Sequence, residues 1–350
     1  MPDRDDLIDR PSETLRAPTM ADVARLADVS TATVSNYLSG RAELLRRMGP
    51  EVQERVREAA RALGYVNNKT ARHLRIQRTE RICVLLPQLG IPYADQIANQ
   101  IDAIARARGY SAIIVTAHSL EEWQRVLAEV EGGLADGIIG DADGFSEDEL
   151  GELFGDGTRT GKAHLVLHAN AAPRGFSVVN YDRLSALGLA LDRLRAHGRR
   201  RLAYFENVSQ RRNPRAALVR DYVARPDSGM ELVAMLQCAS SRATAAEAVR
   251  QLMAGEIRPD AIVVESDFSA VTVIEELQRA GVNVPADIAV IGCGNAEEGL
   301  FANPRLTTIG PTAISLAEPT THLIDRIEQK GELGVRSFVL PWTLIARDSG

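Results

Sequence analysis

The sequence has little cysteine and no long apolar run. Its three cysteines, Cys83, Cys238 and Cys293, lie far apart in a chain of 350 residues. An odd number of widely spaced thiols argues against a disulfide framework and against a four-thiolate zinc site. No apolar run approaches the ~20 residues that span a bilayer, and the charged first 20 residues lack the apolar stretch of a secretory signal. We therefore expect a cytoplasmic protein with no membrane partner.

The recognisable motifs of enzymes are also missing. His164 and His168 share one face of a predicted strand, but no third zinc ligand accompanies them. The segment 141–144 (DADG) begins like a calcium loop and lacks the later ligands. The segment 292–295 (GCGN) is not followed by the third glycine of a dinucleotide-binding loop, and no G-x-S-x-G or phosphate-loop lysine motif occurs. The sequence predicts no enzyme activity, no metal site and no cofactor.

The composition is that of an ordinary globular protein, but the charge is unevenly distributed. Apolar residues make up 45% and charged residues 25% of the chain, and its length suggests two or three domains. Residues 20–78 hold eleven basic and six acidic side chains, whereas residues 79–350 hold 27 basic and 36 acidic ones. A basic module of net charge +5 beside a body of net charge −9 predicts a polyanionic partner for the front end only.

The front end has the start and stop signals of three short helices. They are predicted over residues 19–27, 31–38 and 50–63. Thr19 and Ser30 can cap the first two, Asp28 is a turn residue that tolerates a positive φ, and Pro50 suits the first position of the third. The preceding residues 1–18 are polar and aperiodic, so we expect them to form a disordered tail.

The first two helices and the tight turn between them suit a helix-turn-helix. In such a motif the N-terminal end of the second helix enters the major groove. The side chains exposed there would be Thr31, Ala32 and, one turn further on, Asn36. A plain pair of antiparallel helices without DNA affinity is the alternative that geometry alone leaves open.

From residue 81 onward, strands alternate with amphipathic helices. Strands are predicted over 82–87, 112–116, 137–139, 163–167, 177–179, 201–205, 230–236, 261–264, 288–291 and 337–340. Repeated strand–helix–strand units predict parallel sheets that are covered on both faces. About 270 residues of this pattern are more than a single α/β sheet usually contains, so we expect two α/β lobes with a ligand cleft between them.

Several segments, taken in order, resemble a known family. They include ADVARLADVSTATVSNYLSG, ERVREAARALGYVNNKTARHLR, RICVLLP, LADGIIG, RPDAIVVESD, NPRLTTI and LPWTLIARDS. Together they are similar to the LacI/GalR family of bacterial transcription regulators over about residues 19–349. The resemblance implies an α/β protein with a helix-turn-helix headpiece at 19–66, a hinge helix and linker at 67–80, and a two-lobed, periplasmic-binding-protein-like core of parallel sheets at 81–350.

The resemblance also implies which residues contact DNA. The recognition-helix positions are Ser30, Thr31, Ala32, Thr33 and Asn36, and the hinge positions are Asn68, Ala71, Arg72 and Leu74. Leu74 would wedge into the minor groove and kink the duplex. Many relatives carry arginine where this chain has Asn36, which predicts a preference for adenine over guanine at that base. The segment 41–48 is longer than usual, so we expect an enlarged basic loop there.

In the core, the resemblance implies an effector-binding cleft between lobes at 81–180 plus 310–332 and at 182–308 plus 335–349. The cleft positions are Tyr93, Asp182, Arg215, Asp267, Phe268 and Asn295. Sugar-binding relatives carry an aromatic residue and two aspartates where this chain reads CGN at 293–295, and Leu218 replaces a glycine. The aromatic content of only 5% argues against a simple hexose as the effector. A carbohydrate-like effector is nevertheless the default, and an anionic or nucleoside-like metabolite, or no ligand, remains open.

These observations predict a transcription regulator in the cytoplasm, associated with the nucleoid. It would bind a palindromic, double-stranded operator as a homodimer, because two headpieces related by two-fold symmetry need two half-sites. An effector would change the angle between the lobes, and repression is favoured over activation. Two alternatives remain: a regulator that no effector controls, and a solute-binding protein without DNA function.

Overall fold

The structure is a computed structural model with two compact units, one ending at Gln77 and the other beginning at Arg78. Each unit is described by itself. The residues described are 18–38, 42–65, 78–155, 162–206, 213–238, 241–329 and 333–350. Among them, no helix combines the length and apolar character needed to cross a membrane.

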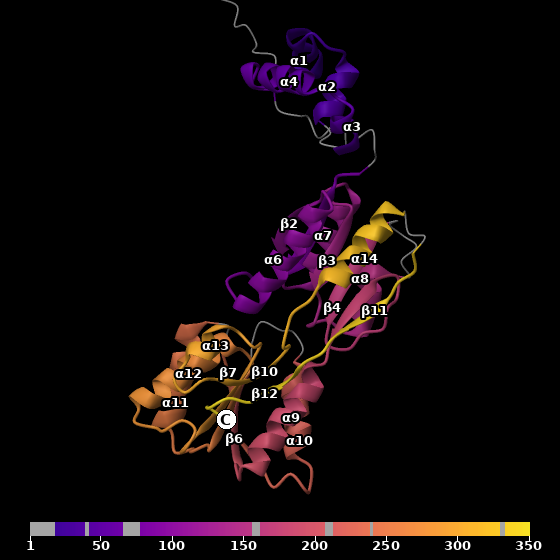
Figure 1. The fold of residues 1–350 in the computed structure, drawn as a ribbon. Helices are drawn as coiled ribbons and strands as arrows, with labels where there is room; N and C mark the ends of the chain where they lie inside the picture. The colour runs from indigo at the N-terminus through magenta and orange to yellow at the C-terminus, as the bar shows by residue number, and fades with distance from the viewer. Residues whose placement is uncertain are drawn as a thin grey trace, which may run out of the picture. The chain divides into compact units, whose positions relative to one another are not determined.

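The first unit is helical (Figure 1). Its helices are α1 (Met20–Ala27), α2 (Thr31–Leu38), α3 (Ala42–Arg46) and α4 (Pro50–Ala62). The predicted cap of α1 is confirmed: the Asp22 amide donates to Thr19 Oγ1 over 3.3 Å, and the Thr19 amide donates to the Asp22 carboxylate over 2.9 Å. Asp28 has φ 51°, as predicted for the turn. Short-range capping therefore sets the helix boundaries of the helix-turn-helix.

A small apolar core holds these helices together. Its buried members are Val23, Ala24, Ala27, Val34, Val56 and Ala59. They come from α1, α2 and α4, at the spacing that brings one helical face inward. Val34 is the fully buried side chain of α2, and Tyr37 and Leu38 pack partly buried against the same core. Thr31, Ala32 and Asn36 of this helix remain exposed.

The expectation of an enlarged loop at 41–48 is wrong for most of that segment. Residues 42–46 (AELLR) form α3, because alanine, leucine, glutamate and arginine are strong helix formers. The Gln53 side chain of α4 donates to the carbonyls of Leu45 and Met48, each over 2.8 Å. The C-terminal end of α3 is thereby tied to α4.

The second unit contains two six-stranded sheets. The first has the order β11-β5-β4-β3-β1-β2 and the second the order β12-β10-β9-β8-β6-β7. The strands of the first are β1 (Arg81–Leu86), β2 (Ser111–Thr116), β3 (Gly137–Asp141), β4 (Ala163–His168), β5 (Ser177–Tyr181) and β11 (Ser337–Leu340). Those of the second are β6 (Arg201–Glu206), β7 (Glu231–Gln237), β8 (Ala261–Val264), β9 (Ala289–Cys293), β10 (Thr307–Gly310) and β12 (Thr343–Ile345). All pairings are parallel except that of β12 with β10.

Helices cover both faces of each sheet. They are α6 (Pro92–Ala107), α7 (Leu120–Glu131), α8 (Glu147–Phe154), α9 (Arg183–Ala196), α10 (Pro214–Val223), α11 (Arg242–Ala254), α12 (Asp267–Arg279), α13 (Glu298–Phe301) and α14 (Ala317–Glu328). Along β1, Ile82, Val84 and Leu86 join the core that includes α6 and α14, whereas Cys83 and Leu85 join the core of α7 and α8. This alternation is the period of two that a strand covered on both faces requires.

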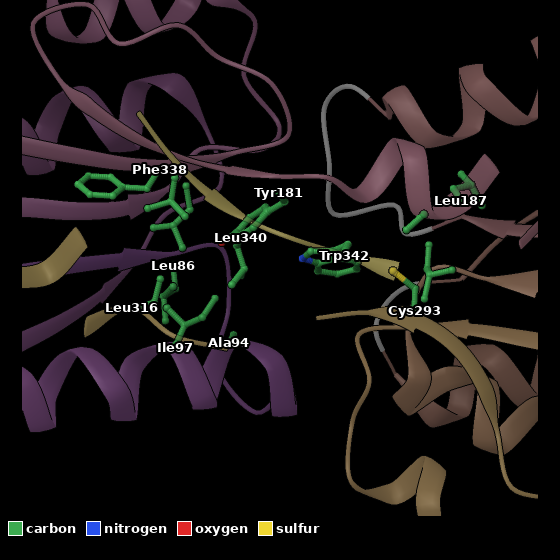
Figure 2. Packing of buried hydrophobic residues seen from close by; sticks show 14 of the residues in the cluster. Leu86, Ala94, Ile97, Tyr181, Leu187, Cys293, Leu316, Phe338, Leu340 and Trp342 are labelled. Carbon is green, nitrogen blue, oxygen red and sulfur yellow. The ribbon is translucent and has the colours of Figure 1, made fainter. Parts of the chain in front are cut away.

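Three connections join the two lobes: β5 to α9, β10 to α14 and β11 to β12. The expectation that residues 335–349 lie wholly in the second lobe is wrong, because β11 pairs in parallel with β5 of the first sheet. The chain crosses instead at Trp342, between β11 and β12. Figure 2 shows Leu340 and Trp342 on this connection, with Tyr181 of β5 near Leu340 and Cys293 of the second sheet beyond Trp342. All four residues belong to one buried cluster.

Candidate functional site

The N-terminal end of α2 presents small polar side chains to solvent. Ser30, Thr31, Ala32 and Asn36 are exposed and Thr33 is half-buried. The Thr33 amide donates to Ser30 Oγ over 3.0 Å, and the two hydroxyl oxygens lie 2.9 Å apart. Ser30 thus caps the helix as predicted. The three exposed side chains of the helix, Thr31, Ala32 and Asn36, form a surface that matches the recognition end of a helix-turn-helix.

The predicted hinge lies outside the described residues. Asn68, Ala71, Arg72 and Leu74 all fall in the segment 66–77, so their role in DNA binding stays a prediction.

The second unit holds a small cavity at the carboxyl ends of strands from both sheets. Its volume is about 100 Å³, and it is lined by Pro87, Gln88, Ile91, Tyr93, Ala94, Asp141, Arg183, Arg215, Glu265, Ser266, Cys293, Gly294 and Trp342. Several of these residues end or follow a strand: β1, β3, β8 or β9. The carboxyl ends of parallel strands are where ligands of open α/β sheets bind. The cavity is therefore the candidate ligand site, and both lobes contribute to it.

Two predicted cleft residues line this cavity, and four do not. Tyr93 and Arg215 are lining residues. Asp182 is exposed just before α9. Phe268 lies under the guanidinium of Arg242, whose Cζ is 4.5 Å from the ring centroid.

Asp267 and Asn295 make internal contacts instead of lining the cavity. Asp267 is buried and accepts from the Thr308 hydroxyl over 2.6 Å and from the Ala296 amide over 2.7 Å. Burial raises its pKa to about 6. The Asn295 side chain donates to the Pro311 carbonyl over 2.9 Å and accepts from Arg347 over 2.6 Å. Both residues fix the chain between β9 and β10.

Arg183, which the sequence did not single out, lines the cavity and makes several contacts there. Its guanidinium carbon lies 4.4 Å from the ring centroid of Tyr181, 4.7 Å from that of Trp342 and 5.3 Å from that of Tyr93. Its Nη1 donates to Asp143 Oδ2 over 2.6 Å. Since Arg183 opens α9 while Tyr93, Tyr181 and Asp143 belong to the first lobe, this side chain links the two lobes.

The pKa values of the two aspartates near Arg183, Asp141 and Asp143, are shifted in opposite directions. Burial raises the pKa of Asp141 to about 6, and the charge of Asp143 adds to this effect. Burial also opposes the ionisation of Asp143, but the neighbouring guanidiniums of Arg183 and Arg215 outweigh it and lower the pKa of Asp143. Asp143 is therefore the permanent counter-charge, and Asp141 is the carboxyl that a nearby ligand can influence.

A second buried ion pair lines the same cavity. Arg215 Nη2 lies 3.1 Å from Glu265 Oε2. Glu265 Oε1 also accepts from the Tyr204 hydroxyl over 2.5 Å and from the Asn213 amide over 2.6 Å. Arg215 Nη1 is 3.7 Å from Cys293 Sγ, yet burial dominates and raises the pKa of that thiol. Cys293 is thus a neutral wall of the cavity.

Some cavity-lining residues that were not predicted from the sequence could have been found from their position near the end of a strand. Asp141, Glu265 and Cys293 lie within two residues of the ends of predicted strands, where parallel sheets collect ligand-binding side chains. Trp342 falls within a motif that was recognised, but only the lobe crossover brings it to the cavity. No group of three or more potential metal ligands occurs among the described residues.

Comparison with known proteins agrees with this architecture. The family profile of the bacterial regulatory proteins of the lacI family matches residues 19–68, and that of the periplasmic binding protein-like domain matches residues 187–350. The HTH-type transcriptional regulator GntR of Pseudomonas aeruginosa is 30% identical, and the match covers 97% of this chain and 98% of that protein.

Two solved structures share the fold over nearly the whole chain. The lac repressor dimer bound to operator and the anti-inducer ONPF gives a TM-score of 0.77 at 21% identity, covering 95% of this chain and 99% of the repressor chain. The transcriptional regulator CelR in complex with cellobiose gives 0.63 at 25% identity, covering 95% and 100%. The resemblance found in the sequence and the predicted fold class are confirmed. The chain belongs to the lacI family of bacterial regulatory proteins and is a DNA-binding transcriptional regulator.

Proposed function

We propose that the protein represses transcription by binding a two-fold symmetric operator as a homodimer, and that a small molecule in the cavity controls its affinity for DNA. The observation that carries the proposal is that the cavity is walled by both lobes, with Arg183 linking them. A ligand there has different contacts when the lobes move, which is the requirement for coupling between two sites. The lac repressor dimer on its operator and the CelR complex with cellobiose provide precedents for both partners.

The dimer face would come from the core. β2 and β7 are outer strands of their sheets, and their apolar side chains are half-buried, with Ile114 42% exposed. An outer strand with exposed apolar residues is a surface that soluble proteins normally cover. Pairing of two such faces would present two copies of α2 to two half-sites.

The role would be one of binding rather than catalysis. The Cys293 thiol lines the cavity with a raised pKa, so it is a poor nucleophile. The protein would work in the cytoplasm, where its operator DNA is found.

Selection of bound duplexes from a random DNA pool by the purified full-length protein tests the proposal. We expect a palindromic motif with two half-sites, which requires a symmetric dimer. A single unrepeated half-site would contradict dimeric binding, and enrichment of no motif would contradict the proposed function.

Two alanine variants supply a matched control for the recognition surface. Ala32 and Ala21 are each the second residue of a helix, α2 and α1, and both are exposed. Ala32→Asp adds a negative charge at the proposed groove surface, so we expect operator affinity to fall by roughly tenfold or more compared with Ala21→Asp. Equal losses in the two variants would remove α2 from the account.

A further inference from the structure

An aspartate at the amino-terminal edge of the first sheet holds the chain where the core begins. Asp136 directly precedes β3, and its carboxylate accepts from the Thr79 amide over 2.8 and 3.0 Å and from the Glu80 amide over 2.8 Å. Thr79 and Glu80 directly precede β1, the neighbour of β3 in the sheet. Because β3 ends at Asp141, which lines the cavity, this contact lies at the opposite edge of the sheet from the cavity.

The contact is buried and charged. Asp136 is only 5% exposed, and hydrogen bonds from amides to a carboxylate are about twice as strong as those between neutral groups. Glu80 has φ 55°, in the left-handed region that non-glycine residues rarely adopt, and its carbonyl accepts from the Ser111 amide over 2.9 Å. A residue kept in such a conformation is held by its surroundings. The backbone at Glu80 is therefore fixed in both position and direction.

A second contact lies one residue before Thr79. Arg78 Nη2 donates to the carbonyl of Glu328, the last residue of α14, over 2.6 Å, and cations are favoured at this end of a helix. The end of α14 is itself tied down, because Arg108 Nη2 binds the carboxylates of Asp325 and Glu328 over 2.8 and 2.7 Å. The Arg78 contact is exposed and holds a side chain, whereas Asp136 holds the backbone.

The second lobe has the same arrangement at a place to which no headpiece is attached. Asp260 directly precedes β8 and accepts from the Arg200 amide over 2.8 and 3.0 Å and from the Arg201 amide over 2.9 Å. These amides lie at the start of β6, the neighbour of β8, and the chain enters there from α9 of the same lobe. The distinguishing feature of Asp136 is thus the chain that it holds, which leads to the headpiece.

We propose, on the basis of the dimer function proposed above, that Asp136 is a positioning residue for operator binding. It fixes the point at which each chain leaves the core, and thereby limits the spacing at which two headpieces reach two half-sites. Linked binding modules act together only when the chain between them spans their sites. Release of Arg78 and Thr79 from the core adds up to about 7 Å of chain in each protomer, which is about the rise of two base pairs.

Operators of altered spacing test this role in the full-length protein. The palindrome obtained by selection is made with unchanged half-sites and with one or two base pairs added at its centre. Fluorescence anisotropy gives the dissociation constant for each duplex, and the spacing ratio is the constant for a lengthened operator divided by that for the selected one. We expect a wild-type spacing ratio of roughly tenfold or more with two added base pairs, because sites beyond reach lose their effective concentration.

Substitutions at two matched aspartates locate the effect. Asp136→Ala removes all contacts to the two amides and should lower the spacing ratio roughly threefold or more. Asp136→Asn keeps the shape of the side chain but not its charge, and should lower the ratio roughly twofold, which also tests the proposal if the alanine variant fails to fold. Asp260→Ala loses the same contacts in the second lobe and should keep the wild-type ratio. A merely structural role would leave every ratio unchanged, since each ratio compares two duplexes bound by the same folded protein.

Two results overturn the inference: a wild-type spacing ratio near one, or a ratio that does not distinguish the Asp136 variants from Asp260→Ala. Its failure can be told apart from failure of the proposed function. Selection by the wild-type protein decides whether a two-fold symmetric operator exists, whereas the spacing series starts from an operator already found. A wild-type protein that selects no palindrome contradicts the proposed function and this inference with it.

Discussion

The ion pair of Arg183 and Asp143 offers a quantitative test of how the two lobes are held together. Only 7% and 4% of the two side chains are exposed, so neither charge is well solvated. Breaking such a pair from one side leaves a buried charge and costs about 3–5 kcal/mol. We expect Arg183→Met to lower the free energy of unfolding by about that amount at pH 7, because methionine can fill the space over the rings but cannot pair with Asp143.

A double-mutant cycle separates the pair from the packing. Asp143→Asn alone leaves the Arg183 charge without its partner, although Asp141 nearby softens the loss. In the double variant no charge is stranded, so the two losses should be less than additive by about 2 kcal/mol or more. Urea unfolding followed by tryptophan fluorescence measures the free energy of unfolding of each variant, since the Trp342 ring packs against the Arg183 guanidinium.

The pH dependence of this loss has a defined sign. Asp143 has a folded pKa below its ordinary value of 3.8, so the pair stabilises the protein above about pH 4 and its contribution is lost as the pH falls through the folded pKa. In Arg183→Met this guanidinium no longer offsets burial, so Asp143 binds its proton at a higher pH than in the wild type. The penalty of Arg183→Met should therefore shrink steadily as the pH falls from 7 through 4. Additive single losses, or a penalty that grows in acid, would refute this reasoning.

Three further predictions concern other parts of the molecule. Gly292→Ala should lower the free energy of unfolding by about 2–3 kcal/mol, because its Cβ would lie 2.2 Å from Asp267 Oδ1. A Cβ added at Gly188 in α9 would have no atom within 4 Å, so Gly188→Ala should instead raise the free energy of unfolding by up to about 1 kcal/mol. Urea unfolding of both variants measures the contrast. The pKa of Asp267 is raised from 3.8 to about 6, so ionisation of this carboxyl lowers the free energy of unfolding of the wild type as the pH rises through that interval. The free energy of unfolding of Asp267→Asn should therefore increase by up to about 3 kcal/mol relative to that of the wild type between pH 4 and pH 7.5. The same difference between the two proteins in urea unfolding at both pH values would contradict this. Asn36→Arg should shift the preferred base from adenine to guanine at one position of each half-site, and an unaltered motif in the selected DNA would remove Asn36 from base reading.

Local rules explain why so much of the headpiece could be predicted. The caps at Thr19 and Ser30 and the left-handed turn at Asp28 depend on residues within a few positions of each other, and all three occur as expected. Helix α3 was missed because a resemblance to shorter relatives suggested a loop. Its own residues, AELLR at 42–46, favoured a helix.

The strands of the core were found where they are apolar and missed where they are short. β10 and β12 have four and three residues, and the sequence of β10, TTIG, carries little apolar signal. Their existence depends on pairing with each other and with β9. Such long-range pairing is not written in local periodicity, and the same cause explains why the crossover at Trp342 was misplaced.

The cavity shows the limit of reading a site from one sequence. Asp182 was expected there, yet its neighbour Arg183 lines the cavity. Consecutive residues at the start of a helix point about 100° apart, so a shift of one position moves a side chain from the interior to solvent. In the same way, Glu265 faces the cavity while Asp267, two residues further on and inside α12, bonds to Thr308.

The central claim is that occupancy of the cavity and binding of operator are coupled. The direct measurement is the dissociation constant of the full-length protein for its selected operator, with and without a saturating concentration of a small molecule that calorimetry shows to bind the protein. Coupling between two sites typically changes affinity by roughly 5- to 150-fold, and we expect a change in that range. An operator affinity that stays the same when the small molecule is bound would contradict the account.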